Sequence, residues 1–302
     1  YTVAEGNTDR AAGDDVPVNF IMADAAGNNS ATFTTAISQA SDAIDANAPT
    51  ITNVSIPNAT AKVGDAVTVT ITAGEAGLSL NTGQVNGVNV TGFSDDGGGS
   101  YSATYTVVEG NTDRAAGDDV PVSFVLTDGA GNSSATFTTA ISQNADAIDA
   151  NTPTLSSTSP ADDATDVGIS SNITLTFNED IAFGTGNIQI IDLGDNSSTV
   201  TIDAALPGSQ ASISGHVLTM NPSSALELNT NYSVQIAGAA IDDLTGNSYA
   251  GIVDNTTLNF TTINTSIAFS ATTSSAAEST ASANLQVTLN AISGVNVSVD
   301  YA

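Results

Sequence analysis

The sequence predicts an all-β protein built from units of β-sandwich size, and three observations lead to this prediction. No window shows convincing helical periodicity, several short segments alternate apolar and polar residues, and a long stretch is repeated at an offset of 104 residues. A repeat of about 100 residues is too long for one turn of a solenoid and has the size of one sandwich domain.

The repeat relates residues 1–51 to residues 105–155. Both copies contain EGNTDRAAGDDVPV, and most differences are conservative, such as Ile21 for Val125 and Met22 for Leu126. On this alignment, residues 1–47 correspond to the last strands of a unit whose first half is missing from the sequence. A half-sandwich cannot bury its own apolar face. We therefore expect either that the sequence is an excerpt of a longer chain, which we favour, or that a neighbouring molecule completes this half.

Strands are readable throughout the complete unit, residues 48–151. Residues 66–72 alternate apolar residues with threonine, as a half-buried strand does. Residues 94–100, rich in glycine and aspartate, are predicted as a hairpin turn. The other predicted strands are 85–90, 101–107, 120–127 and 135–141.

The charge of the chain has almost one sign. The sequence holds 32 Asp and Glu against 3 Lys and Arg, for a formal net charge of −29. Binding to nucleic acid or to an anionic membrane surface requires basic patches, which Arg10, Lys62 and Arg114 cannot form. Both classes of partner are excluded, and the acidity points to cations.

Cysteine and histidine chemistry is also limited. The chain has no cysteine, which excludes disulfides, thiol nucleophiles and cysteine-based zinc sites. The only histidine, His216, reads as a turn residue and argues against histidine metal centres and catalytic triads. There is no apolar run long enough to cross a membrane, and the first residues do not have the pattern of a signal peptide.

Four short motifs relate the first part of the chain to a known family. They are YSATYTV at 101–107, EGNTD at 109–113, DGAGN at 128–132 and the linker DANTP at 149–153. On these motifs, residues 1–151 resemble the tandem immunoglobulin-like (Ig-like) domains of large bacterial surface proteins and RTX-type adhesins.

The remaining segments resemble two other modules. Residues 152–263 contain SPADDATDV at 159–167, NITLTFNE at 172–179 and DDLTGN at 242–247, and resemble the bacterial Ig-like module of S-layer proteins and multidomain secreted proteins. Residues 264–302 contain IAFS at 267–270, LQVTL at 285–289 and VSVDY at 297–301, which would be strands, and are similar to the opening of a Calx-beta domain.

Together these resemblances imply tandem Ig-like β-sandwich domains arranged as an elongated rod, with partial domains at both ends. The expected parts are 1–47, the C-terminal part of an Ig-like domain; 48–151, a complete Ig-like domain; 152–263, an Ig-like domain of the second type; and 264–302, the N-terminal part of a Calx-beta-like domain.

Acidic residues gather in loops that an Ig-like sandwich places at one end. The loop before strand F, residues 109–119, and the exit of strand G, residues 146–151, meet where one domain joins the next. The predicted metal ligands of the complete domain are Glu109, Asp113, Asp118, Asp119, Asp146, Asp149 and Asn151. Those of the partial first domain are Glu5, Asp9, Asp14, Asp15, Asp42, Asp45 and Asn47.

Calcium is the cation that suits these loops. Two carboxylates at close range repel by about 1 kcal/mol in water and more when partly buried, and Arg114 alone cannot neutralise the cluster. Ca²⁺ accepts six to eight oxygen ligands in flexible geometry, whereas Mg²⁺ demands an octahedron and keeps its waters. The stretch DANAP at 45–49 also resembles the cadherin linker, where Asp and Asn ahead of a Pro bind calcium, although Ala48 replaces an acidic residue of that pattern.

The simpler interpretation is that these loops are solvated turns, because Asp and Asn are favoured in turns. We favour calcium for the linker clusters. For the F–G turn, which carries Asp128 and Asn132 and faces the preceding linker, and for Asp242–Asp243 with Asn247, we favour a plain turn. Asp95–Asp96 reads as a hairpin tip, and the boundary near residue 264 has no acidic residue and is expected to bind no calcium.

The sequence thus predicts a structural stalk or fibre segment of a large secreted bacterial surface adhesin, extracellular or on the cell surface, stiffened by Ca²⁺ at its linkers. Its expected partners are neighbouring domains of the same chain, with self-association into fibres possible. The alternative is a carbohydrate-binding module, but tryptophan is absent and Tyr101 and Tyr105 share a strand face, which suggests core packing. An enzyme is not expected, because the carboxylates lie in repeated turns and do not form one paired site.

Overall fold

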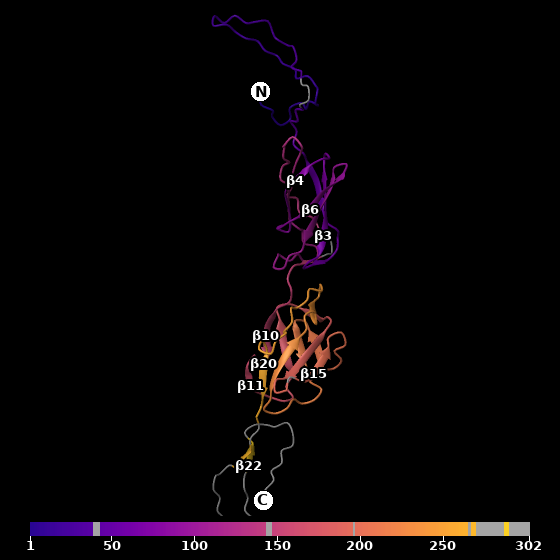
Figure 1. The fold of residues 1–302 in the computed structure, drawn as a ribbon, viewed down its shortest axis with the longest axis vertical. Coiled ribbons are helices and arrows are strands. Elements are labelled where there is room, and N and C mark those ends of the chain that lie inside the picture. Colours follow the sequence, from indigo (N-terminus) through magenta and orange to yellow (C-terminus); the bar gives the residue numbers. More distant parts are fainter. Residues whose placement is uncertain (39–42, 143–146, 196, 265–266, 270–286, 290–302) are drawn as a thin grey trace, which may run out of the picture. The chain divides into compact units, whose positions relative to one another are not determined.

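The computed structural model describes residues 1–38, 43–142, 147–195, 197–264, 267–269 and 287–289. These residues form strands and turns without a helix (Figure 1), which confirms the all-β prediction. Within the same ranges, no helix is available that is long and apolar enough to cross a membrane. The chain divides into two units, residues 1–150 and residues 151–302.

The first unit contains a sandwich of two sheets. One sheet has the order β1 (Ile51–Ser55), β3 (Ala66–Ala73), β7 (Ser100–Thr106) and β6 (Thr91–Gly97). The other has the order β5 (Val88–Asn89), β4 (Ser79–Val85) and β8 (Val122–Thr127). A short parallel pair joins β2 (Ala61–Lys62) to β9 (Ile148–Asp149).

Alternation along the strands builds the core between these sheets, as the sequence predicted. Tyr101 and Tyr105 of β7 and Phe124 and Leu126 of β8 are fully buried, while their neighbours in sequence are partly exposed. Tyr101 stacks on Phe93 at 5.3 Å between ring centroids. Both tyrosines serve the core, as expected from their spacing.

The single strand predicted over 85–90 is wrong. The chain reverses at Asn86 and Gly87, whose φ values of 51° and 79° are those of a type I′ hairpin turn. Consequently β4 ends at Val85 and β5 starts at Val88. The turn predicted over 94–100 is narrower, because β6 continues to Gly97, and residues 135–141 pair through isolated bridges and form no continuous strand.

Residues 1–47 repeat the last hairpin of the complete domain. The bridges Val16 to Ile37 and Phe20 to Phe33 correspond, at the offset of 104, to the bridges Val120 to Ile141 and Phe124 to Phe137. The repeat therefore specifies the same local pairing in both places.

The second unit is another sandwich. One sheet has the order β10 (Leu155–Ser159), β12 (Ile173–Phe177), β17 (Val217–Met220) and β16 (Ala211–Ser214). The other has the order β11 (Ala164–Val167), β20 (Asn259–Thr262), β18 (Asn231–Ile236), β14 (Asn187–Asp192) and β15 (Ser197–Asp203). A separate two-stranded sheet pairs β13 (Ile181–Phe183) with β19 (Ile241–Asp243). The fully buried residues of this unit include Tyr232, Phe260, Leu218 and Ile190.

The last part of the chain is described at two short strands. β21 (Ile267–Phe269) pairs antiparallel with β22 (Val287–Leu289), in agreement with the first two strands predicted there. The third, at 297–301, lies outside the described residues.

Candidate metal-binding site

Asp9 ties the end of residues 1–47 to the linker that follows. Its Oδ1 accepts the backbone N–H of Ala46 at 2.8 Å, and its Oδ2 accepts the Asn47 side-chain amide at 2.8 Å. These two hydrogen bonds lower the pKa of Asp9 below its ordinary value, and the one from the Ala46 backbone has the larger effect. The carboxylate is therefore held ionised beside the linker.

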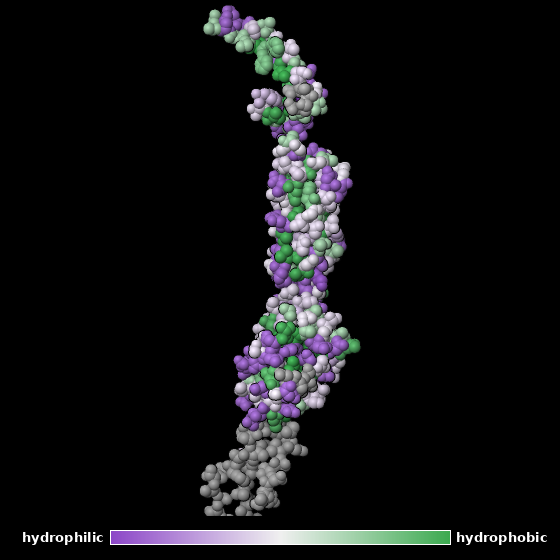
Figure 2. Space-filling model, viewed as in Figure 1, coloured by the Kyte–Doolittle hydropathy of each residue, from purple (hydrophilic) through white to green (hydrophobic). Residues whose placement is uncertain are grey.

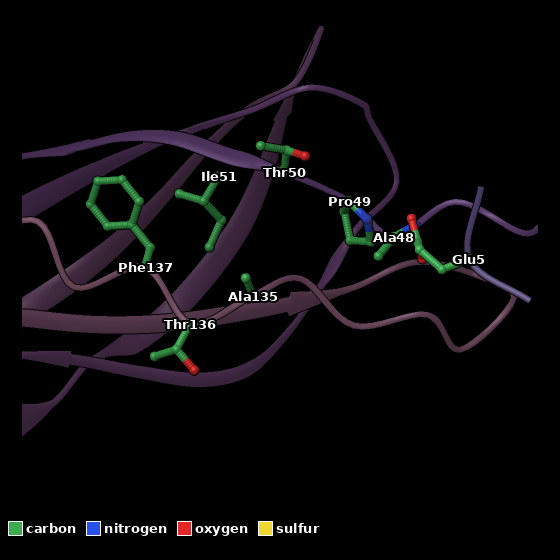
Figure 3. Close-up of a pocket in the computed structure, with 8 residues that line it drawn as sticks. All are labelled: Glu5, Ala48, Pro49, Thr50, Ile51, Ala135, Thr136 and Phe137. Atoms are coloured by element: carbon green, nitrogen blue, oxygen red, sulfur yellow. The ribbon is translucent and has the colours of Figure 1, made fainter.

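Glu5 approaches the same linker from a neighbouring position. Its two carboxylate oxygens lie 3.2 and 3.3 Å from the backbone nitrogen of Ala48, which donates to them. Glu5 also lines a shallow pocket with Pro49, Ile51 and Phe137 (Figure 3). Thr50 and Thr136 line it together with these apolar side chains, and the Glu5 carboxylate lies at one end.

The F–G turn of the complete domain reaches this linker as well. Asn132 donates its side-chain amide to the backbone carbonyl of Asp45 at 3.4 Å and to Asp128 Oδ2 at 2.9 Å. Burial raises the pKa of Asp128, but hydrogen bonds from Asn132, Ala130 and Gly131 outweigh it, so the net shift is downward. The turn that the sequence placed near the linker thus contacts it, and its carboxylate is also ionised.

Glu75 is the residue that sequence reasoning missed. Burial, followed by the negative charges of Asp128, Asp45 and Asp9, raises the pKa of Glu75. All three neighbouring charges are carboxylates, and they come from the linker, from the loop before the F strand and from the F–G turn. Glu75, Asp9, Asp45 and Asp128, which we call the linker cluster, therefore share one acidic neighbourhood.

A signal for Glu75 did exist in the sequence. It sits in the loop between two strands, residues 74–78, and its backbone carbonyl accepts the buried hydroxyl of Tyr101 at 2.9 Å. This loop, between β3 and β4, corresponds to the B–C loop of an Ig-like sandwich, which lies at the same end as the F–G loop. A lone glutamate in that loop was therefore a ligand candidate on topology alone.

Other predicted ligands of the two repeat copies lie in turns, and within the described residues these make no hydrogen bond to the linkers. Asp14 and its counterpart Asp118 cap their own turns, accepting the backbone N–H of Ala11 at 3.1 Å and of Ala115 at 3.0 Å. Asp15 and Asp119 are exposed next to them. Asp42 and Asp146 lie outside the described residues.

Residues 105–151 repeat the contacts that Asp9 and Gly6 make with the first linker. Asp113 Oδ1 accepts the backbone N–H of Ala150 at 2.8 Å, as Asp9 does from Ala46. Gly110 donates to the carbonyl of Ala150 just as Gly6 donates to that of Ala46. Glu109 and Asp149 occupy the positions of Glu5 and Asp45 in the repeat.

The second unit carries an analogous turn. Asp243 is buried and accepts backbone N–H groups from Thr245, Gly246 and Asn247. The Asn247 amide donates to Asp243 Oδ2 at 2.8 Å and to the carbonyl of Asn151 at 3.2 Å. The predicted plain turn is present, and in addition its asparagine contacts the start of the unit, as Asn132 contacts Asp45.

The linker cluster presents the carboxylate oxygens of Glu75, Asp9, Asp45 and Asp128, and the Asn47 amide and the backbone carbonyl of Asp45 lie beside them. Carboxylate, amide and backbone carbonyl oxygens are the ligands that Ca²⁺ takes, in numbers of six to eight. The arrangement is thus chemically suited to a hard divalent cation.

His216 lies beside a turn of the second unit, and three of the tyrosines lie in the two cores. His216 has a half-exposed side chain, with its Nδ1 3.7 Å from Asp180 Oδ1, next to a turn at Gly215. Tyr101, Tyr105 and Tyr232 are fully buried.

Comparison with known proteins locates the family signal in the second unit. Residues 149–262 match the family model of the bacterial Ig-like domain. No curated protein matches the chain. The resemblance stated for residues 152–263 is confirmed by this match.

Several solved structures are similar to the chain at low identity. A Ca²⁺-stabilised adhesin that helps an Antarctic bacterium reach out and bind ice is 16% identical, over 82% of this chain and 58% of that one, with a TM-score of 0.28. A 1.5-MDa bacterial ice-binding adhesin is 15% identical, over 81% and 71%, with a TM-score of 0.26. The fibronectin(III)-like modules of Clostridium thermocellum CbhA are 15% identical, over 70% and 95%, with a TM-score of 0.20.

This chain spans 58% of the length of the Antarctic adhesin structure, so it compares with a part of that molecule. Over residues 149–262, the chain matches the bacterial Ig-like domain family, in its sequence and in its all-β fold.

Proposed function

We propose that this chain is a structural segment of an extracellular bacterial surface adhesin, in which Ca²⁺ bound at the linkers stiffens and stabilises the row of domains. The observation that carries the proposal is the linker cluster. Asp9 accepts hydrogen bonds from Ala46 and Asn47 of the linker, and the Asn132 amide joins the carbonyl of Asp45 to the carboxylate of Asp128. The charges of Asp9, Asp45 and Asp128 also raise the pKa of Glu75. Such a set of carboxylates is costly to gather without a cation.

The ligand set supports calcium more than other cations. With one histidine and no cysteine in the chain, soft or borderline metals lack their preferred ligands. Carboxylates, the Asn47 amide and backbone carbonyls together can supply the six to eight oxygens of Ca²⁺. Extracellular modules bind Ca²⁺ with dissociation constants of about 10⁻⁴ to 10⁻³ M, which millimolar calcium outside a cell would saturate.

The proposal extends to the second linker through the repeat. Glu109, Asp113, Asp149 and Asn151 hold the same positions as Glu5, Asp9, Asp45 and Asn47. A chain that repeats this ligand set at each linker would order successive domains in the same way. Neighbouring domains of the same chain are then its main partners.

Calcium titration of the full chain by calorimetry tests this function. We compare the wild type with the double variant Asp9→Asn/Asp45→Asn. The control is Asp192→Asn/Asp203→Asn, which removes the same charge from turns of the second unit. We expect saturable binding in the millimolar range or tighter, at least about tenfold weaker at one site in the linker variant and unchanged in the control.

Two results would reject the proposal. One is the absence of saturable calcium binding by the wild type. The other is an equal loss in the linker variant and the control, which would mean that calcium responds only to overall charge.

A further inference from the structure

The complete domain and the second unit share a short motif, D-x-x-G-N, although only the second unit matches the bacterial Ig-like family model. The motif occurs at residues 128–132 and 243–247, and a third copy lies at residues 24–28. In each copy the aspartate accepts the backbone N–H of the asparagine through Oδ1 and its side-chain amide through Oδ2, at 2.8–3.0 Å. The turn at residues 24–28 is exposed and has the same bonds, so the motif forms from its own residues.

The asparagine of this turn also reaches a second partner. A side-chain amide has two N–H donors, and the bond to the aspartate uses one of them. Asn132 also donates to the backbone carbonyl of Asp45 at 3.4 Å, and Asn247 to that of Asn151 at 3.2 Å. These contacts span 87 and 96 residues, and both carbonyls belong to the stretch of chain that leads into the domain carrying the turn.

The two carbonyls are not equivalent positions of the repeat. At the offset of 104, Asp45 corresponds to Asp149, whereas Asn247 contacts the carbonyl two residues later. Every residue of a linker has a backbone carbonyl, so the asparagine requires no particular side chain there. The contact is therefore independent of which linker residue carries the acceptor.

One peptide group of the first linker is held from both sides. The carbonyl of Asp45 accepts from Asn132, and the N–H of Ala46, which is in the same peptide group, donates to Asp9 Oδ1 at 2.8 Å. Ala46 is 2% exposed, and hydrophilic residues lie on the surface where this linker meets the complete domain (Figure 2). Because a peptide group is planar and rigid, hydrogen bonds at both ends fix its orientation.

We propose that the D-x-x-G-N turn is a metal-independent anchor for the incoming linker, with Asn132 and Asn247 as its positioning residues. The aspartate holds the asparagine side chain in place, and the asparagine binds a backbone carbonyl of the linker. An amide needs no cation to donate a hydrogen bond, so the anchor acts in chelator as well as in calcium. This goes beyond the proposed function, because calcium would then bind to a linker that is already ordered.

Amide hydrogen exchange of the full chain in chelator, resolved by NMR for each residue, tests the anchor. Asn132→Leu removes the side-chain donors without changing the charge and leaves the backbone bonds of the turn in place. We expect the Ala46 amide to exchange about threefold to tenfold faster in this variant, as the loss of one hydrogen bond predicts. The Val120 amide, which bonds to the carbonyl of Ile141 at 2.8 Å, reports on the rest of the domain and should change less than about 1.5-fold.

Two further variants complete the test. Asn28→Leu is the matched control, because it breaks the same bond to the turn aspartate in the other copy of the repeat. It should leave the exchange of Ala46 within about 1.5-fold of the wild type. Asn132→Asp keeps the shape of the side chain, and it should accelerate Ala46 as Asn132→Leu does, because an ionised carboxylate donates no hydrogen bond.

The anchor is rejected if Ala46 exchanges equally fast in the wild type and in both Asn132 variants. It is also rejected if Ala46 and Val120 accelerate by the same factor, which would mean a general loss of stability. Failure of the calcium function is a separate result, since the exchange is measured in chelator. If the wild type binds no calcium and the Asn132 variants still accelerate Ala46 alone, the anchor stands without the calcium site.

Discussion

At the scale of single residues, a buried asparagine joins a turn to the loop before β8. Asn86 is 4% exposed, adopts a positive φ, and bonds both to Arg114 and to the Thr112 carbonyl. It therefore meets a conformational and a hydrogen-bonding requirement at once.

We predict that Asn86→Ala destabilises the first unit by about 2–4 kcal/mol, because alanine tolerates the left-handed conformation poorly and leaves buried polar partners unsatisfied. Asn86→Gly keeps the turn and should cost about 1 kcal/mol less. Urea unfolding of the full chain measures both. Equal effects of the two variants would show that the turn conformation contributes nothing.

Asp254 provides a pH-dependent contact in the second unit. Its carboxylate accepts hydrogen bonds from the backbone N–H and the hydroxyl of both Thr256 and Thr257. These bonds, of which the one from the Thr256 backbone has the largest effect, lower the pKa of Asp254 to about 2. Because the folded pKa is below the unfolded one, the stabilisation is complete above the unfolded pKa of about 3.9 and is lost as pH falls toward 2.

We therefore expect Asp254→Asn to lower the stability of the second unit at pH 6 and to have little effect at pH 2. NMR titration of the Asp254 carboxyl gives the direct measurement. A midpoint near the ordinary value of aspartate would contradict this account.

The charged side chain of Glu75 should destabilise the fold without calcium and stabilise it when calcium is bound. Burial and three neighbouring carboxylates raise its pKa, so in the absence of a cation the charged side chain opposes folding. Its folded pKa is above the unfolded one, so stability rises as pH falls through the folded pKa.

Glu75→Gln should consequently raise the melting temperature in chelator and lower it in calcium, if Glu75 is a ligand. Thermal unfolding in the two conditions decides. A change of the same sign in both would remove Glu75 from the site.

At the scale of elements, the strands were predictable where one face is buried. The alternation of β3, β7 and β8 appears directly in the sequence because each strand has one core face. The hairpin at Asn86 was missed, since valines on both sides continue the apolar pattern through the turn, although Asn-Gly is a strong turn signal.

The candidate site was only partly predictable for a physical reason. Glu5, Asp9, Asp45 and Asn47 are close to one another because hairpin pairing and the linker bring them together, which the repeat and topology indicated. Glu75 lies in a separate loop, which topology places at the same end of the sandwich, but its hydrogen bond to Tyr101 is a long-range contact that the local sequence around Glu75 does not indicate.

Gly83 tests how tightly β4 packs on β8. A Cβ there would also lie 2.9 Å from Val90, so Gly83→Ala should destabilise the first unit by about 1–3 kcal/mol through overpacking. Gly129 has open space around its Cβ position, and Gly129→Ala is the control with an expected effect within about 0.5 kcal/mol. Denaturant unfolding compares the two, and equal effects would contradict tight packing at Gly83.

At the scale of the whole molecule, a net charge of −29 with three basic residues favours the binding of cations. Calcium that binds the folded linker but not the unfolded chain stabilises by mass action, by about 2.7 kcal/mol at a hundredfold excess over the dissociation constant. The same residue types recur at the offset of 104, so an effect of calcium at the first linker would recur at the second.

Thermal unfolding of the full chain, in 10 mM calcium and in chelator, tests this central claim most directly. We predict that calcium raises the lowest melting transition by about 5–10 °C in the wild type and by less than half of that in Asp9→Asn/Asp45→Asn. Identical transitions in calcium and chelator, or an equal shift in the variant, would contradict calcium-dependent linkers and leave the acidic loops as solvated turns.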